Sequence, residues 1–174
     1  VIRTNALETI WGTADLLAAA EASPDAILIP KVAHPGDIIS SAKILKSVNA
    51  AEKTRLWAMM ETPLAILSVH AISVAAADPA NRFECFVMGT NDLAKETRAR
   101  LVPGRAAFLP WLQSCLAAAR AYGIEIIDGI GSTEMLHIFL SNQPGRVRYG
   151  STGWPVPGYE VELRGEDGKA VPDG

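Results

Sequence analysis

"LWAMMETPLAILSVHAISVAAADPANRFECFVMGTND", residues 56–92, contains one complete strand-helix-strand unit. The apolar run 56–60 is typical of a buried strand and is followed by Glu61. Apolar residues at three- and four-residue spacing predict a helix over 63–76. A second apolar run, 83–88, leads into Gly-Thr-Asn-Asp. Two strands joined by a helix predict a parallel pair whose carboxyl ends meet at one edge of a sheet.

The same rhythm extends to both sides of this unit. Further strands are predicted at "VIRTNAL" from Val1, "AILIPKV" from Ala26 and "IEIIDG" from Ile124. Helices are predicted between them over 14–22, 37–48 and 105–122, and Pro110 is expected to kink or divide the last. The order βαβαβαβαβ predicts an α/β fold of about five parallel strands, with a sheet covered on both faces.

The composition changes near the end of the chain. Residues 143–174 hold half of the 14 glycines and have no helical period. We expect loops and one hairpin there, with "YEVEL" (159–163) as a strand and "GEDG" as its turn. The turn "GIGSTE" is expected to lead into a helix. The predicted domains are therefore 1–129 and 130–174.

Charge and composition exclude several classes of protein. The formal net charge is −3, with no basic face, so neither nucleic acid nor membrane is an expected partner. No apolar run approaches the roughly 18 residues of a membrane span. Cys85 and Cys115 have no second cysteine or histidine at ligand spacing, which indicates reduced, partly buried thiols and a cytoplasmic location.

Each predicted parallel strand ends close to a functional side chain. Chemistry in such folds sits at the carboxyl ends of strands, so these residues are the candidate site: Arg3, Asn5, Lys31, Glu61, Asn91, Asp92 and Asp128. Glu61 and Asp92 end consecutive strands and could share one Mg²⁺, with water and substrate oxygens completing its shell. Arg3 would bind a substrate carboxylate. The backbone amides of Gly89, Thr90 and Asn91 would lie beside the same ion.

Structural interpretations of these residues stay open at this point. Glu61 or Asp92 could cap the amino end of a helix. Lys31 is expected to be structural, or to face the substrate, rather than to act in catalysis. Ser132 would make a good helix N-cap, with Glu134 in the first turn.

Residues 1–129 resemble the citrate lyase beta subunit and malyl-CoA lyase family. The resemblance rests on "VIRTNALETIWGTADL", "DAILIPKV", "LWAMMETPLAIL", "VMGTNDLAKE" and "CLAAARAYGIEIIDG". It implies a TIM-type (β/α) barrel with Mg²⁺ on Glu61 and Asp92, and keto-acid oxygens bound by Arg3. Under this resemblance Lys31 could face the CoA group. The implied reaction cleaves a 3-hydroxyacyl-CoA into an acyl-CoA and a 2-keto acid. Ala33 replaces an acid that usually follows "PKV" in that family.

A full barrel of this kind takes about 250 residues, so five strands are expected to form only part of one. The open sheet edges would then allow a homo-oligomer. The remainder, "DGIGSTEMLHIFLSNQPGRVRYGSTGWPVPGYEVELRGEDGKAVPDG", resembles the adenylate-forming acyl-CoA ligases, the benzoate-CoA ligase group in particular. That resemblance implies ATP phosphate and Mg²⁺ contacts from Ser132, Thr133 and Glu134.

The two resemblances predict a chimera of two enzyme pieces joined near Asp128. Three functions follow from them. The first is an Mg²⁺-dependent carbon–carbon lyase acting on a citryl- or malyl-type CoA ester. The alternatives are a non-catalytic chimeric fragment and an ATP-dependent aryl- or acyl-CoA ligase.

Overall fold

A computed structural model describes residues 1–127, 129–131, 135, 138–143, 145–148 and 151–171. The chain divides into two compact units, Val1–Ile126 and Ile127–Gly174. Within the described residues, no helix is long and apolar enough to cross a bilayer.

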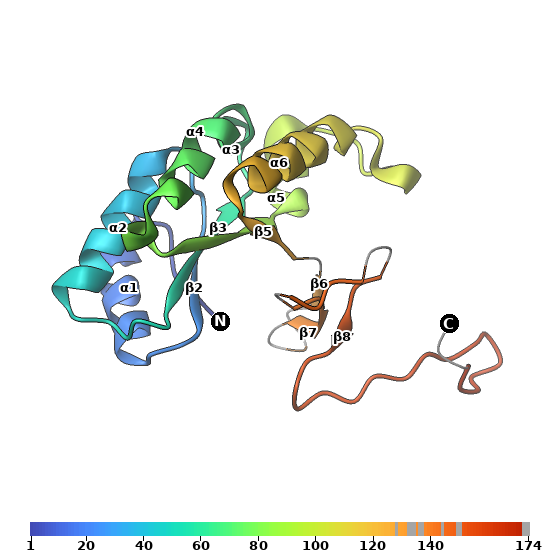
Figure 1. The fold of residues 1–174 in the computed structure, drawn as a ribbon. Helices are drawn as coiled ribbons and strands as arrows, with labels where there is room; N and C mark the ends of the chain where they lie inside the picture. Colours follow the sequence, from blue (N-terminus) through green and yellow to red (C-terminus); the bar gives the residue numbers. More distant parts are fainter. Residues whose placement is uncertain (128, 132–134, 136–137, 144, 149–150, 172–174) are drawn as a thin grey trace. The chain divides into compact units, whose positions relative to one another are not determined.

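The first unit contains five parallel strands in sequence order, β1-β2-β3-β4-β5 (Figure 1). Their bounds are β1 Ile2–Arg3, β2 Ala26–Ile29, β3 Arg55–Met60, β4 Phe83–Met88 and β5 Glu125–Ile126. The helices between them are α1 Gly12–Glu21, α2 Pro35–Ser47, α3 Pro63–Leu67, α4 Val69–Val74, α5 Thr90–Thr97 and α6 Leu109–Tyr122. The predicted alternation is confirmed, because parallel neighbours need a crossover and at least one helix lies in each of the four crossovers.

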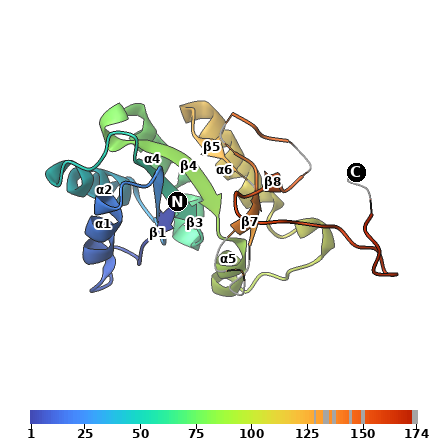
Figure 2. The same ribbon diagram turned by 90° about the horizontal axis from the view of Figure 1, so that it is seen from below.

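Helices α1, α2, α4 and α6 pack side by side along the sheet (Figures 1 and 2). In β3, the buried Leu56, Ala58 and Met60 join the core formed with these helices. The alternate residues Trp57 and Met59 are only half-buried. Burial in β3 therefore alternates between a fully buried and a half-buried face, whereas all four residues of β2 are buried, as expected for a sheet covered on both faces.

Two details of the helices differ from the sequence prediction. The helix predicted over 63–76 is divided into α3 and α4 at Ser68, followed by a short 3-10 turn at Ala75–Ala77. Pro110 does not kink a helix, because α6 begins at Leu109 and Pro110 lies in its first turn. A proline there removes no helical hydrogen bond, since the first amides have no partner within the helix.

The second unit contains a three-stranded antiparallel sheet, β6-β7-β8, formed by Gly129–Gly131, Ile138–Ser141 and Trp154–Pro155. The helix expected after "GIGSTE" is wrong for residues 138–141, which pair with β6 as a strand. The strand expected at 159–163 is also wrong. Val161 and Leu163, the apolar residues of that segment, are exposed. The turn that follows does form, closed by an antiparallel bridge between Arg164 and Ala170.

Candidate functional site

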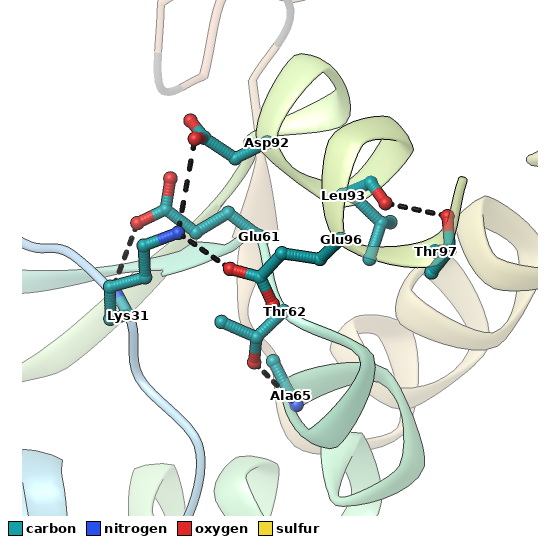
Figure 3. A network of polar contacts seen from close by, with 8 residues as sticks. All are labelled: Lys31, Glu61, Thr62, Ala65, Asp92, Leu93, Glu96 and Thr97. Carbon is teal, nitrogen blue, oxygen red and sulfur yellow. Dashed lines mark hydrogen bonds and ion pairs between the residues drawn. The ribbon is translucent and has the colours of Figure 1, made fainter. Parts of the chain in front are cut away.

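Four charged residues converge at the carboxyl ends of β2, β3 and β4. Lys31 follows β2, Glu61 follows β3, and Asp92 and Glu96 lie on α5, which follows β4. These strands are parallel neighbours in the sheet, so their ends reach the same edge. Figure 3 shows the Asp92 and Glu96 carboxyl groups turned toward the Lys31 ammonium and the Glu61 carboxyl turned toward the Lys31 backbone N–H. We call these four residues the charged cluster.

Glu61 is the buried member of the cluster, with 3% of its surface exposed. Its Oε1 accepts a hydrogen bond of 2.9 Å from the backbone N–H of Lys31. That N–H can reach across because Lys31 adopts a left-handed backbone conformation, with φ of 55°. Such a conformation is uncommon outside glycine and is frequent at functional sites. Glu61 is thus held at a fixed position by its neighbour strand.

Gly89 packs directly against Glu61. A Cβ built on Gly89 would lie 2.5 Å from the Glu61 Cβ and 3.1 Å from its Oε2. The Gly89 N–H donates to the Met60 carbonyl at 3.1 Å, which ties this turn to the end of β3. Glycine is therefore required by close approach, since its φ of −84° is open to other residues.

The Lys31 ammonium lies among the three carboxylates. Its Nζ donates to Glu96 Oε1 at 2.9 Å and lies 3.8 Å from Asp92 Oδ1. The side chains of Lys31 and Glu96 are about one-third exposed, and that of Asp92 is 53% exposed. The cluster therefore has one buried acid at its base and two more accessible acids above it.

The surroundings shift the pKa values of two of these groups. Burial raises the pKa of Glu61, and the charge and hydrogen bond of the Asp92 carboxyl raise it further, against the opposing effect of Lys31. Burial lowers the pKa of Lys31, but this is outweighed by the hydrogen bond to Glu96 and by the charges of Glu61, Glu96 and Asp92, so its pKa is raised. The contacts from Lys31 thus do not offset the cost of burying the Glu61 carboxylate, while Lys31 stays charged at neutral pH.

A pH dependence of stability follows from the raised pKa of Glu61. Between the ordinary value of 4.5 and the raised value, the folded state binds more protons at Glu61 than the unfolded state. The free energy of unfolding must then fall as pH rises through this window. We expect the melting temperature of the metal-free protein to decline with pH more steeply than that of Glu61→Gln, measured by circular dichroism.

Glu52→Gln is the matched control, because Glu52 is exposed and precedes β3 at the opposite end of that strand. It should keep the wild-type slope. Parallel curves of melting temperature against pH for the wild type and Glu61→Gln would contradict the raised pKa of Glu61.

The carboxylates of Glu61 and Asp92 form the pair that could hold a metal. Their donors are hard oxygen atoms, which suit Mg²⁺. Burial, and to a lesser degree the neighbouring Asp92 carboxyl, raises the pKa of Glu61, so a cation on the pair would stabilise its ionised form. In the described part of the chain, no group of three or more His, Cys, Asp or Glu side chains could hold a metal ion. A cation on this pair would thus be completed by water and substrate oxygens, as is usual for Mg²⁺.

The helix-capping interpretation of Glu61 is wrong. Thr62 is the N-cap of α3, and its side chain accepts a hydrogen bond of 3.0 Å from the Ala65 N–H (Figure 3). Capping therefore leaves the Glu61 carboxyl available. Gly89 occupies the N-cap position of α5, and Asp92 lies in the first helical turn rather than at the cap.

The remaining predicted site residues are distributed around this cluster. Thr90 and Asn91 begin α5 directly after Gly89. Arg3 is exposed on the edge strand β1, two strands from β3, and within the described residues it makes no side-chain hydrogen bond or ion pair with the cluster. Its role in substrate binding stays a prediction. Asn5 instead donates from its backbone and side chain to Asp15. Asp128, Ser132, Thr133 and Glu134 lie outside the described residues.

Glu96 is the member of the cluster that sequence reasoning missed. It lies four residues after Asp92, and residues at this spacing share one face of a helix. That spacing could have revealed it, had α5 been predicted as a helix.

The sequence of this chain matches a known protein family. Residues 1–152 match the model of the HpcH/HpaI aldolase/citrate lyase family. A (3S)-malyl-CoA thioesterase of Cereibacter sphaeroides is 46% identical over 130 residues, which are 75% of this chain and 42% of that protein. The chain thus spans about two fifths of the length of that relative. A benzoate–CoA ligase of Thauera aromatica is 62% identical over 50 residues, 29% of this chain and 10% of the ligase.

The fold is shared with solved structures. RipC from Yersinia pestis aligns over 71% of this chain and 54% of its own, with a TM-score of 0.58 and 23% identity. The protein CitE from Mycobacterium tuberculosis, in complex with magnesium and acetoacetate, aligns over 71% and 48%, with a TM-score of 0.55 and 23% identity. With five parallel strands in barrel order and a family match over most of its length, the chain belongs to the HpcH/HpaI aldolase/citrate lyase family.

Proposed function

We propose that this chain forms the metal-binding part of an enzyme that cleaves a carbon–carbon bond in a 3-hydroxyacyl-CoA of the citryl or malyl type. The observation that carries the proposal is the convergence of the buried Glu61 carboxyl and the accessible Asp92 carboxyl at one edge of the sheet. The relation to a malyl-CoA thioesterase and the magnesium complex of CitE support the choice of substrate and ion.

The proposed reaction transfers one proton from oxygen to carbon as one carbon–carbon bond breaks. The bond between the α- and β-carbons of the acyl group breaks, the 3-hydroxyl loses its proton and becomes the carbonyl of the keto acid, and the α-carbon gains a proton. For malyl-CoA, the products are glyoxylate and acetyl-CoA. When bound, Mg²⁺ would polarise the oxygen that becomes this carbonyl.

The chain's own residues set the position of that ion. Glu61 and Asp92 are its proposed ligands, and the Lys31 N–H and the Gly89 backbone fix the Glu61 side chain. A fixed ligand needs no reorganisation during the reaction, which is the main advantage of a preorganised site. Arg3 is proposed to bind the carboxylate of the keto acid by two hydrogen bonds.

Thioester hydrolysis is the second candidate function. The similarity to (3S)-malyl-CoA thioesterases favours it, because the same substrate can be cut at a different bond. Water would then attack the thioester carbonyl and release malate and free CoA. The same carboxylate pair would hold the ion in both reactions.

The test is a product assay on the chain with (3S)-malyl-CoA and Mg²⁺. Glyoxylate and acetyl-CoA are expected, with loss of both after chelation or in Glu61→Gln, while Glu52→Gln behaves as the wild type. Malate and free CoA would instead support the thioesterase. Unchanged malyl-CoA would favour a non-catalytic piece. ATP–pyrophosphate exchange with benzoate, the test of the ligase alternative, is expected to be undetectable.

A further inference from the structure

We propose that Glu96 is a positioning residue, which holds the Lys31 ammonium away from the Glu61–Asp92 pair so that the pair can accept a divalent cation. This inference rests on the metal site proposed above. It assigns a task to the one acid of the charged cluster that is not a proposed ligand.

Lys31 presents two groups to the cluster with different effects. Its backbone N–H supports Glu61 through the 2.9 Å hydrogen bond to Oε1. Its ammonium is a positive charge at the place where a cation would bind, and it would compete with that cation. The first group is held by the backbone conformation, but the second lies at the end of a flexible four-carbon stem.

The distances show which acid holds the ammonium. Lys31 Nζ is 2.9 Å from Glu96 Oε1, a full hydrogen bond, and 3.8 Å from Asp92 Oδ1, too far for one (Figure 3). Glu96 therefore takes the hydrogen bond, and the Asp92 carboxylate keeps only the longer ion pair of 3.8 Å with the ammonium. Asp92 and Glu96 lie one helical turn apart on α5, so a small movement of the stem would exchange one partner for the other.

The charges of the cluster agree with this role. With the three carboxylates ionised and Lys31 protonated, the cluster carries two negative charges, which one divalent cation would neutralise. Without Glu96, only one negative charge would remain for the ion, and the ammonium would turn to Asp92 as its nearest acid. The pair would then hold Lys31 in place of the metal.

Stability is not a sufficient reason for the Lys31–Glu96 pair. Both side chains are about one-third exposed, and exposed ion pairs contribute on the order of 0–1 kcal/mol. We therefore expect Glu96→Gln to leave the melting temperature of the metal-free protein nearly unchanged. If Glu96 had a merely structural role, Glu96→Gln would lower the melting temperature and leave the Mg²⁺ affinity unchanged.

The test is a double-mutant cycle on Mg²⁺ binding, measured by isothermal titration calorimetry with the whole chain. The four proteins are the wild type, Glu96→Gln, Lys31→Met and the double variant; Glu52→Gln is the charge-matched control. Methionine keeps the stem and the backbone N–H of Lys31 and removes only the ammonium. Glu96→Gln should weaken Mg²⁺ binding roughly tenfold, in the range known for residues that orient ligands.

Lys31→Met should bind Mg²⁺ more tightly, and adding Glu96→Gln to it should change affinity by less than about twofold. That loss of effect would show that Glu96 acts through Lys31. If Glu96→Gln weakened Mg²⁺ binding equally in the wild type and in Lys31→Met, Glu96 would attract the ion directly, and the inference would be overturned. Wild-type affinity in Glu96→Gln would overturn it while leaving the metal site intact. No Mg²⁺ binding by the wild type would overturn both.

Discussion

Asp92→Asn is expected to abolish measurable Mg²⁺ binding while leaving the fold intact. Asp92 is one of only two proposed carboxylate ligands, and a neutral amide is a poor substitute for a carboxylate toward a hard cation. Loss of residues that merely orient ligands costs 10- to 100-fold in metal affinity, so loss of a ligand should cost at least about 100-fold. The side chain is 53% exposed, so its replacement disturbs little packing.

The measurement is a calorimetric titration of Mg²⁺ against the wild type and the variant, with thermal unfolding of both metal-free proteins. Asp78→Asn is a suitable control, because Asp78 caps a 3-10 turn that precedes β4, at the opposite end of that strand from Asp92. The variant should also lower the pKa of Glu61, because the charge and hydrogen bond of Asp92 raise it. Equal heats for the wild type and Asp92→Asn would remove Asp92 from the metal site.

Gly89→Ala is expected to damage both the fold and the metal site. The added Cβ would lie 2.5 Å from the Glu61 Cβ, a separation that real Cβ contacts essentially never show, and Glu61 is buried with little room to yield. Overpacking of this kind typically costs about 1–3 kcal/mol. Displacement of Glu61 should also weaken its hydrogen bond from Lys31 and reduce Mg²⁺ affinity.

Chemical denaturation and Mg²⁺ titration of the same variant separate these two effects. Gly36→Ala is the matched control, because a Cβ at Gly36, in the first turn of α2, would meet only the exposed His34 side chain, at 3.0 Å. It should be nearly neutral in both measurements. If Gly89→Ala kept the stability and Mg²⁺ affinity of the wild type, the turn between β4 and α5 would shift freely and would not position Glu61.

The sequence pattern predicted the framework of the first unit correctly because its signals are local. An apolar run, a helical period and an acid after the run can each be read from a few neighbouring residues, as at Leu56–Glu61. The same local reasoning failed after Gly131, where a turn that suits a helix start is followed by the strand Ile138–Ser141. Pairing with β6 decides that segment, and such pairing joins residues distant in sequence.

The sequence by itself therefore determined the order of strands and helices and placed Glu61 and Asp92 at the ends of neighbouring strands. Only the tertiary structure decided how Lys31 is used, because its left-handed backbone brings an N–H to Glu61 across 30 residues, while its flexible stem brings the ammonium to Glu96 across 65. These contacts depend on the register of three strands and the direction of α5. Distances of this kind are set by the packing of the whole unit and by no local pattern.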